Sequence, residues 1–467
     1  GMTGTETKED YITVNYAGPV WYISNDGADS GQGTIEDPFA TLNKADEMAS
    51  SGDTVLFFGG NYGVSDIYKG LYIAPLEYDG VNYEVSIDGI RLNGQADSTI
   101  IKDILFDGNN TYGIYSHDAE GTTIDNCKIT NKEVGIELYY GSSINIINCE
   151  ITNNSNKGIR AISYEDYQLD VVINNSIINY NGNNSTDDGG SGIEFDSNGS
   201  SLTITNSNIS NNYRGGFSDV SAIYCGTNDN TLNLYNVTIS NNEGHGIFRC
   251  GTGSILDSVI IDNNEGTGIV QLHNSELRNS TISNNKGGGL DDPRDIIIEN
   301  TIIEGNSRND GSNGAGIYAI NGESNYTLSN VIIRNNSTPN GEGGGIYFSS
   351  INGLLDLENV TITNNHANKG GGIYLCCSFP NNASSGDDVS FSALSKCNIY
   401  ENYASTGTDI WYYGNNELNV IVDTFTVATP NDYYAYPIEN ITFDIENHSV
   451  DPIVGDIYVD PSGSNDN

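Results

Sequence analysis

The chain has 467 residues and is rich in glycine (55) but poor in proline (10) and methionine (2). This composition favours many short strands joined by turns over bundled helices. The formal net charge of −44, from 62 acidic and 18 basic residues, repels phosphate and argues against nucleic acid or anionic membrane as a partner. The sequence holds no run of 18 apolar residues, so we expect no membrane insertion.

The first 66 residues are expected to lead into the main domain. Residues 1–18 form a tail that opens on Gly1-Met2, which has the appearance of an expression remnant, and residues 19–66 form a lead-in and cap. The stretch from Pro38 to Ala49 is amphipathic. It predicts a helix that covers the open end of a hydrophobic column.

A repeat occupies residues 67–413. Its marker is an Asn-Asn pair, and the pairs beginning at Asn241, Asn263 and Asn284 are 22 and 21 residues apart. Three short strands need about that many residues, so each repeat is one coil of a solenoid. Alternation points Val237 and Ile239 inward. An Asn precedes the same strand in most coils, where it is expected to adopt the left-handed conformation and form a ladder.

The cysteines have no spacing typical of metal ligands. Cys127, Cys149 and Cys397 recur at one repeat position, where they are expected to be small buried residues. Cys225 and Cys250 each open a Cys-Gly-Thr in successive coils and could form a bridge.

The repeat resembles that of the right-handed β-helix proteins of the pectin-lyase-like superfamily. The segment from Val20-Trp21-Tyr22-Ile23 to Gly52-Asp53-Thr54-Val55 also resembles the lead-in of many secreted members. The resemblance implies an all-β, single-stranded parallel β-helix of about 12 coils with an N-terminal capping helix. It also implies an extracellular or cell-surface location and a ligand groove along the first strand of each coil, which carries the Gly-Ile element.

The C-terminal part is expected to close the helix. Residues 414–450 form a cap, with Leu418 to Phe425 as strand material. In residues 451–467, the stretch from Asp456 to Ser464 resembles the lead-in again, which predicts a linker or the start of a following module.

The residue after each Gly-Ile is expected to point outward into the groove, and in the early coils it is charged. Glu137, Arg160 and Glu194 follow one another, and Asp196 lies two residues beyond Glu194. Two carboxylates two coils apart are separated by about 10 Å, which is near the upper range for an inverting glycosidase. An arginine between them can hold a sugar carboxylate or stabilise developing charge. The alternative is a solvated row of ion pairs.

In the later coils the same position is aromatic. A flat aromatic strip can stack on sugar rings, although aromatic ladders also simply stabilise sheets. The predicted strip consists of Tyr318, Tyr347, Tyr374 and Trp411, and the outward residues Tyr115, His117 and Tyr139 are further candidates for ligand binding.

Two motifs carry less weight. Gly244-His245-Gly246 matches a polygalacturonase motif, but other coils replace the histidine with Thr, Ala or Gly. Acidic side chains near Asn-rich turns make Ca²⁺ possible, although no fixed-spacing loop for it is present and no other metal or cofactor is indicated.

Two functions remain. The first is a non-catalytic module of a secreted or surface protein that binds polysaccharide or a cell-surface glycan, or serves as a structural or adhesive spacer. The alternative is a glycoside hydrolase or polysaccharide lyase that uses Glu137, Arg160 and Glu194. Because the groove has one obvious arginine in a strongly acidic chain, a neutral glycan suits it better than an acidic one.

Overall fold

The computed structural model describes residues 19–450, except 79–80, 83, 109, 164–166, 184–189, 214–219, 227–228, 321–322, 351–352, 378–388 and 415. The chain forms two compact units, Gly1–Glu276 and Leu277–Asn467. Each unit is a stack of coils whose strands pair in parallel with the equivalent strands of the next coil, as the sequence predicts. Strand β29 (His273–Arg278) contains the boundary between the units.

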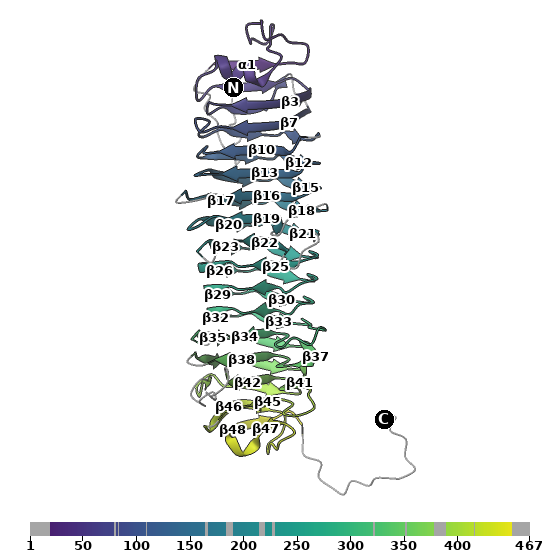
Figure 1. Ribbon diagram of the computed structural model, residues 1–467, viewed down its shortest axis with the longest axis vertical. Helices are drawn as coiled ribbons and strands as arrows, with labels where there is room; N and C mark the ends of the chain where they lie inside the picture. The colour runs from purple at the N-terminus through teal and green to yellow at the C-terminus, as the bar shows by residue number, and fades with distance from the viewer. Residues whose placement is uncertain are drawn as a thin grey trace, which may run out of the picture. The chain divides into compact units, whose positions relative to one another are not determined.

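In the first unit, three rows of parallel strands run along the stack, and Figure 1 shows the first-strand row one strand beneath another. The first-strand row consists of β3 (Gly60–Ile67), β7 (Val85–Leu92), β10 (Tyr112–His117), β13 (Val134–Tyr139), β16 (Lys157–Ile162), β19 (Gly190–Asp196), β22 (Ser221–Cys225), β25 (His245–Phe248) and β28 (Ile269–Val270). The second-strand row consists of β1 (Val20–Ile23), β2 (Thr54–Phe57), β4 (Tyr72–Pro75), β8 (Ile100–Lys102), β11 (Thr122–Asp125), β14 (Ser143–Ile147), β17 (Asp170–Asn174), β20 (Ser201–Thr205), β23 (Thr231–Tyr235) and β26 (Gly251–Asp257). The third-strand row consists of β9 (Leu105–Phe106), β12 (Lys128–Thr130), β15 (Glu150–Thr152), β18 (Ile177–Asn179), β21 (Asn208–Ser210), β24 (Thr238–Ser240) and β27 (Ile260–Asp262), and a small hairpin, β5 (Glu77–Tyr78) and β6 (Val81–Asn82), lies outside these rows.

The second unit repeats the arrangement. Its first-strand row consists of β31 (Leu290–Asp291), β34 (Ile317–Ala319), β38 (Ile346–Ser350), β42 (Ile373–Cys377), β45 (Ile410–Tyr412) and β47 (Ala435–Tyr436). The second-strand row consists of β32 (Arg294–Glu299), β35 (Tyr326–Ser329), β39 (Leu355–Glu358) and β43 (Val389–Phe391). The third-strand row consists of β30 (Thr281–Ser283), β33 (Ile302–Glu304), β36 (Ile332–Arg334), β40 (Thr361–Thr363), β44 (Cys397–Tyr400), β46 (Leu418–Phe425) and β48 (Ile441–His448), and β37 (Ser337–Glu342) pairs separately with β41 (His366–Lys369).

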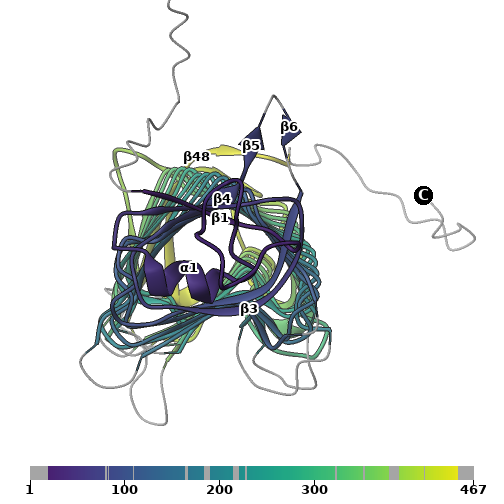
Figure 2. The same ribbon diagram turned by 90° about the horizontal axis from the view of Figure 1, so that it is seen from above.

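A short helix, α1 (Leu42–Met48), lies over the end of the first unit (Figure 2). It is shorter than the predicted helix of residues 38–49, because residues 39–41 make contacts that a helix would not allow. Phe39 forms a bridge with Ile23, and Asp29 accepts hydrogen bonds from the backbone of Ala40 and Thr41. Leu42 and Ala45 are buried, so the helix covers the hydrophobic column as expected.

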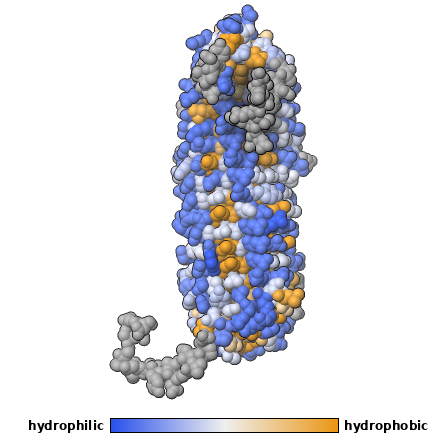
Figure 3. Space-filling view, turned by 180° about the vertical axis from the view of Figure 1, so that it is seen from behind, coloured by the Kyte–Doolittle hydropathy of each residue, from blue (hydrophilic) through white to orange (hydrophobic). Residues whose placement is uncertain are grey.

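The alternation of side chains follows the prediction. The isoleucines of the Gly-Ile elements are buried, among them Ile114, Ile136, Ile159 and Ile193. Cys127, Cys149 and Cys397 are also buried, and Cys225 forms a disulfide with Cys250. The face drawn in Figure 3 is mainly hydrophilic with small, separate apolar patches. The core is therefore the inside of each coil stack.

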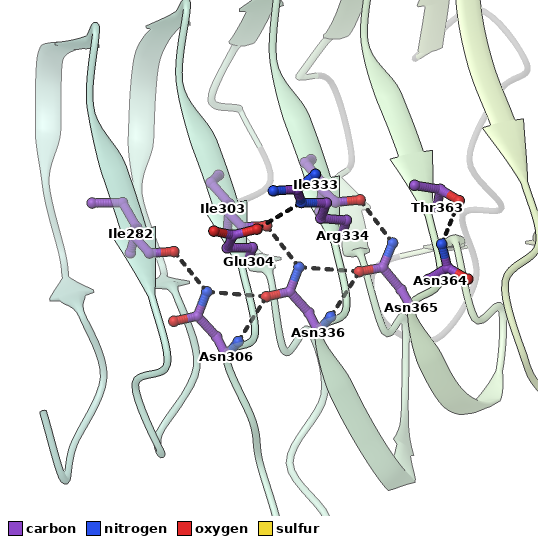
Figure 4. A network of polar contacts seen from close by, with 10 residues as sticks. All are labelled: Ile282, Ile303, Glu304, Asn306, Ile333, Arg334, Asn336, Thr363, Asn364 and Asn365. Carbon is purple, nitrogen blue, oxygen red and sulfur yellow. Dashed lines mark hydrogen bonds and ion pairs between the residues drawn. The ribbon is translucent and has the colours of Figure 1, made fainter. Parts of the chain in front are cut away.

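Asparagines form two kinds of ladder. The predicted turn residues are left-handed, as at Asn175 and Asn236, and some of them hydrogen-bond to the preceding coil. A second ladder was not predicted. It is buried and uses the second Asn of each Asn-Asn pair, or the single Asn of a degenerate copy such as Gly305-Asn306. In the second unit, Asn306 donates from its side-chain amide to Asn336 at 3.0 Å, and Asn336 donates likewise to Asn365 (Figure 4). Because both backbone and side-chain groups are satisfied, these buried amides stabilise the turns.

The buried ladder of the second unit ends on an acid. Asn402 donates to Oδ1 of Asp409 from its side chain at 3.0 Å and from its backbone at 3.2 Å. Asp409 is fully buried, and this burial raises its pKa to about 6.

Candidate functional site

The charged residues predicted from sequence meet on one face of the first unit. Glu137 on β13 is in register with Arg160 on β16, which is in register with Glu194 on β19. The isoleucine before each of them is buried, so all three leave the outer side of the first-strand row. Asp196 and Tyr139 lie two residues further along their strands, and both are in register with Ile162.

Arg160 bridges the two glutamates. Its Nη1 lies 2.8 Å from Oε1 of Glu137, and its Nε lies 3.3 Å from Oε2 of Glu194. The hydroxyl of Tyr139 also donates to Oε1 of Glu137 at 3.1 Å. Although burial opposes it, the hydrogen bond to Glu137 and the charge of Glu194 raise the pKa of Arg160. The guanidinium is therefore a fixed cation held from two sides.

Lys157 completes this group, although its place in the repeat did not mark it as a site residue. Its Nζ lies 3.1 Å from Oε2 of Glu194, and its side chain is buried. Lys157 lies two residues before the buried Ile159. Strand alternation therefore predicts that Lys157 points inward, away from the outward residues of the groove. The charges of Glu137 and Glu194 balance those of Lys157 and Arg160, so the net charge of these four side chains is close to zero.

The two glutamates are less exposed to solvent than the arginine between them. The side chain of Glu137 is 1% exposed, whereas that of Arg160 is 30% exposed. An inverting hydrolase needs both carboxyl groups open to sugar and water between them. Here Arg160 instead occupies the space between the two carboxylates, donating a hydrogen bond to Glu137 and forming an ion pair with Glu194. This contact supports the ion-pair interpretation of Glu137 and Glu194 over the catalytic one.

A cluster of aromatic rings begins at Tyr139, whose hydroxyl accepts a hydrogen bond from Nη1 of Arg160 at 3.1 Å. The ring centroids of Tyr112 and Tyr115 are 5.4 Å apart, and those of Tyr115 and Tyr139 are 5.8 Å apart. His117, which is exposed, lies 5.0 Å from the ring of Tyr140. Burial and the adjacent Glu137 raise the pKa of Tyr112 to about 12, and burial also raises the pKa of Tyr115 and Tyr139. These phenols therefore keep their protons at neutral pH and can donate hydrogen bonds.

Asp196 is the half-buried acid at this surface. Its carboxylate lies against Gly226, where a Cβ would come within 2.0 Å of Oδ1. Burial raises the pKa of Asp196, and the charge of Arg160 partly offsets this effect. The glycine leaves room for the carboxylate beside the arginine.

The predicted aromatic strip forms a continuous column in the second unit. Tyr318, Tyr347, Tyr374 and Trp411 are in register on successive first strands. The ring centroids of Tyr347 and Tyr374 are 5.1 Å apart at an interplanar angle of 8°, and those of Tyr374 and Trp411 are 4.4 Å apart at 4°.

This stacking limits the part of each ring that a ligand could reach. Tyr374 is 5% exposed and has Tyr347 on one face and Trp411 on the other. A sugar cannot stack on a face that a neighbouring ring already covers. The column is therefore a structural ladder through its middle, and a ligand there would meet ring edges.

The remaining motifs give no site of their own. His245 accepts a hydrogen bond at Nδ1 from the backbone of Thr267, which fits a structural role for Gly244-His245-Gly246. Among the described residues, no group of three or more His, Cys, Asp or Glu could hold a metal ion, and no helix is long and apolar enough to cross a membrane.

A family model and several solved structures are similar to this chain. The family model described as "Right handed beta helix region" matches residues 81–222 and 221–389. No curated protein matches the sequence. Similar solved structures include a mannuronic acid specific polysaccharide family 6 lyase from human gut microbiota, with 11% identity, a TM-score of 0.46 and 91% of each chain covered. A periplasmic alginate epimerase has 11% identity and a TM-score of 0.39 over 86% of this chain and 89% of that chain. Pectate lyase Pel9A has 15% identity and a TM-score of 0.33 over 79% of this chain and 82% of that chain.

The stacked parallel coils define a β-solenoid protein. Because the family model covers more than half of the sequence, the chain belongs to the right-handed parallel β-helix family. This assignment rests on the family model and the strand pairing, not on the distant structures.

Proposed function

We propose that the chain is an extracellular, non-catalytic module that binds a neutral polysaccharide on the first-strand face of its first unit. The observation that carries the proposal is the position of Arg160. It is 30% exposed and held between the buried Glu137 and the nearly buried Glu194. A donor fixed in this way loses little freedom when it binds a sugar hydroxyl.

The surrounding groups suit the same ligand. Tyr115 and Tyr139 offer flat carbon surface with protonated hydroxyls, and Asp196 offers an acceptor on the other side of Arg160. Sugars present both apolar ring faces and hydroxyl groups, so they need this mixture. Because Lys157 and Arg160 are balanced by two glutamates in a chain of charge −44, the site has little attraction for a uronate.

The disulfide supports the extracellular part of the proposal. Cys225 and Cys250 are bonded, and structural disulfides persist mainly in oxidising compartments. A module of this kind would work as part of a larger secreted or surface protein.

The test is retardation of the protein in native gels that contain neutral or acidic polysaccharides, followed by titration calorimetry on those that bind. We expect neutral polymers to bind and Arg160→Met to weaken binding at least about tenfold. Arg334→Met is the matched control, because Arg334 pairs with Glu304 at 2.6 Å on the second unit. We expect it to bind like the wild type.

Two outcomes would overturn the proposal. The first is wild-type affinity in Arg160→Met, or no binding to any polymer. The second is the appearance of new reducing ends or unsaturated sugars during incubation with a bound polymer. If Glu137→Gln abolished that release while the variant remained folded, the alternative enzyme function would be established.

A further inference from the structure

The aromatic column of the second unit extends one coil beyond the residues predicted from sequence. Tyr436 on β47 is in register with Trp411 on β45, and their ring centroids are 6.0 Å apart. Tyr413, two residues after Trp411, also stacks on it at 6.0 Å with an interplanar angle of 7°. Among the described residues of this unit, no strand of the first-strand row follows β47.

The two ends of the column differ. At its start, the guanidinium of Arg308 lies 5.3 Å from the ring centroid of Tyr318, and Arg308 pairs with Asp291 at 2.7 Å. At its other end, Tyr436 is 38% exposed and Tyr413 is 57% exposed, in contrast to the buried Tyr374. Flat aromatic surface is therefore open to solvent at the C-terminal end.

We infer that Tyr413 and Tyr436, which both stack on Trp411, form a second carbohydrate-binding surface, the terminal platform, on which pyranose rings of a neutral polysaccharide stack. The inference rests on the proposed function and adds to it a site on the other unit. A pyranose ring can contact the exposed parts of Tyr436 and Tyr413, which combine an aromatic ring with a polar hydroxyl.

The area of the platform suits a sugar better than a protein. A tyrosine buries roughly 200 Å² when fully covered, so the exposed parts of Tyr413 and Tyr436 offer together roughly 200 Å². A stable protein interface needs about 800 Å² from each partner. A surface of this size matches one or two sugar rings, and a second copy of the chain would need a larger patch.

Charge at the platform favours a neutral ligand. The Nζ of Lys369 lies 5.3 Å from the ring centroid of Trp411 and also 3.2 Å from Oε1 of Glu342. The glutamate balances the lysine, so the ammonium can donate to a hydroxyl without making the platform basic. A nucleobase could also stack here, but the charge of −44 repels its phosphates.

Tryptophan fluorescence tests the inference in the full chain. The sequence has two tryptophans, so Trp21→Phe leaves Trp411 as the single reporter. Hydroxyethyl cellulose, xyloglucan, galactomannan, alginate and polygalacturonate are the probes. We expect at least one neutral polymer to change the Trp411 emission and Tyr436→Ala or Tyr413→Ala to weaken that response about tenfold. Tyr436→Phe, which keeps the ring, should retain most of it.

Tyr403→Ala is the matched control, because Tyr403 is 58% exposed and makes no ring contact among the described residues. Its response should equal that of the parent. One outcome would overturn the platform and leave the proposed function standing. In it, a neutral polymer binds and Arg160→Met weakens that binding, but the polymer does not change the Trp411 emission and Tyr436→Ala does not change the affinity. If no polymer binds the wild type, both fail. A stronger response to alginate, or a dimer that Tyr436→Ala dissolves, would also overturn the platform.

Discussion

The Nη1 atom of Arg160 donates to Oε1 of Glu137 across 2.8 Å, and this contact joins a partly exposed cation to a buried carboxylate. The pair has two consequences. It fixes the orientation of a cation that is partly exposed to solvent, and it leaves Glu137 dependent on its partners for solvation.

Glu137→Gln should destabilise the first unit. The substitution keeps the shape but removes a buried charge, so Arg160 and Lys157 face Glu194 alone. Because Arg160 is partly exposed, we expect a loss of about 2 to 3 kcal/mol in the free energy of unfolding, below the full cost of breaking a buried pair. Urea unfolding at pH 7 measures it.

Glu150→Gln is the control for this change. Glu150 forms an ion pair with Lys128 at 2.8 Å, but both side chains are exposed, so a loss below about 1 kcal/mol is expected. Equal losses in the two variants would contradict the role given to burial.

Asp409→Asn should stabilise the second unit at neutral pH. The folded-state pKa of Asp409, about 6, is raised above the ordinary value of 3.8. Its contribution to stability is therefore fully present below about pH 4 and is lost as pH rises through 6. The difference between these pKa values corresponds to about 3 kcal/mol. Urea unfolding at pH 4 to 8 should show a stability advantage of the Asn variant that grows with pH. An advantage that does not change with pH would contradict this account.

Asn336→Ala should weaken the buried ladder. The backbone and side-chain amides of Asn306 both donate to Oδ1 of Asn336 at 3.0 Å, and the alanine leaves these buried donors without that acceptor. We expect a cost of about 2 to 4 kcal/mol, with faster amide exchange at Asn306. Asn330→Gly is the control. Asn330 has a φ of 56° and an exposed side chain, so glycine fits its backbone and should cost less than about 1 kcal/mol.

Removal of the disulfide with Cys225→Ala and Cys250→Ala should lower the stability of the first unit by about 3 kcal/mol, because the bridge closes a loop with a sequence separation of 25. Thermal unfolding with and without reductant measures the effect. Reductant should have no effect on the double variant. A similar response to reductant in both proteins would show that the bridge is absent in solution.

Local pattern predicted some elements closely and others in part. Strand β46 spans Leu418–Phe425, the bounds expected from its apolar residues. Helix α1 begins at Leu42 rather than Pro38, because Phe39 forms an isolated bridge with Ile23 of β1. Tyr436 was missed because its coil has no Gly-Ile element, although its strand pairs with β45 in the same register as the others.

The sequence by itself determined the coil, the inward isoleucines and the side of the sheet from which Glu137, Arg160 and Tyr374 leave, because strand alternation depends only on neighbours along the chain. Only the tertiary structure decided which of these residues reach solvent. Arg160 and Tyr139 cover Glu137, and Tyr347 and Trp411 cover Tyr374. Those covering groups come mostly from other coils, about 4.8 Å away in space but 20 or more residues away in sequence. The pairing of Lys157 with Glu194 and the open end of the column at Tyr436 depend on the same stacking.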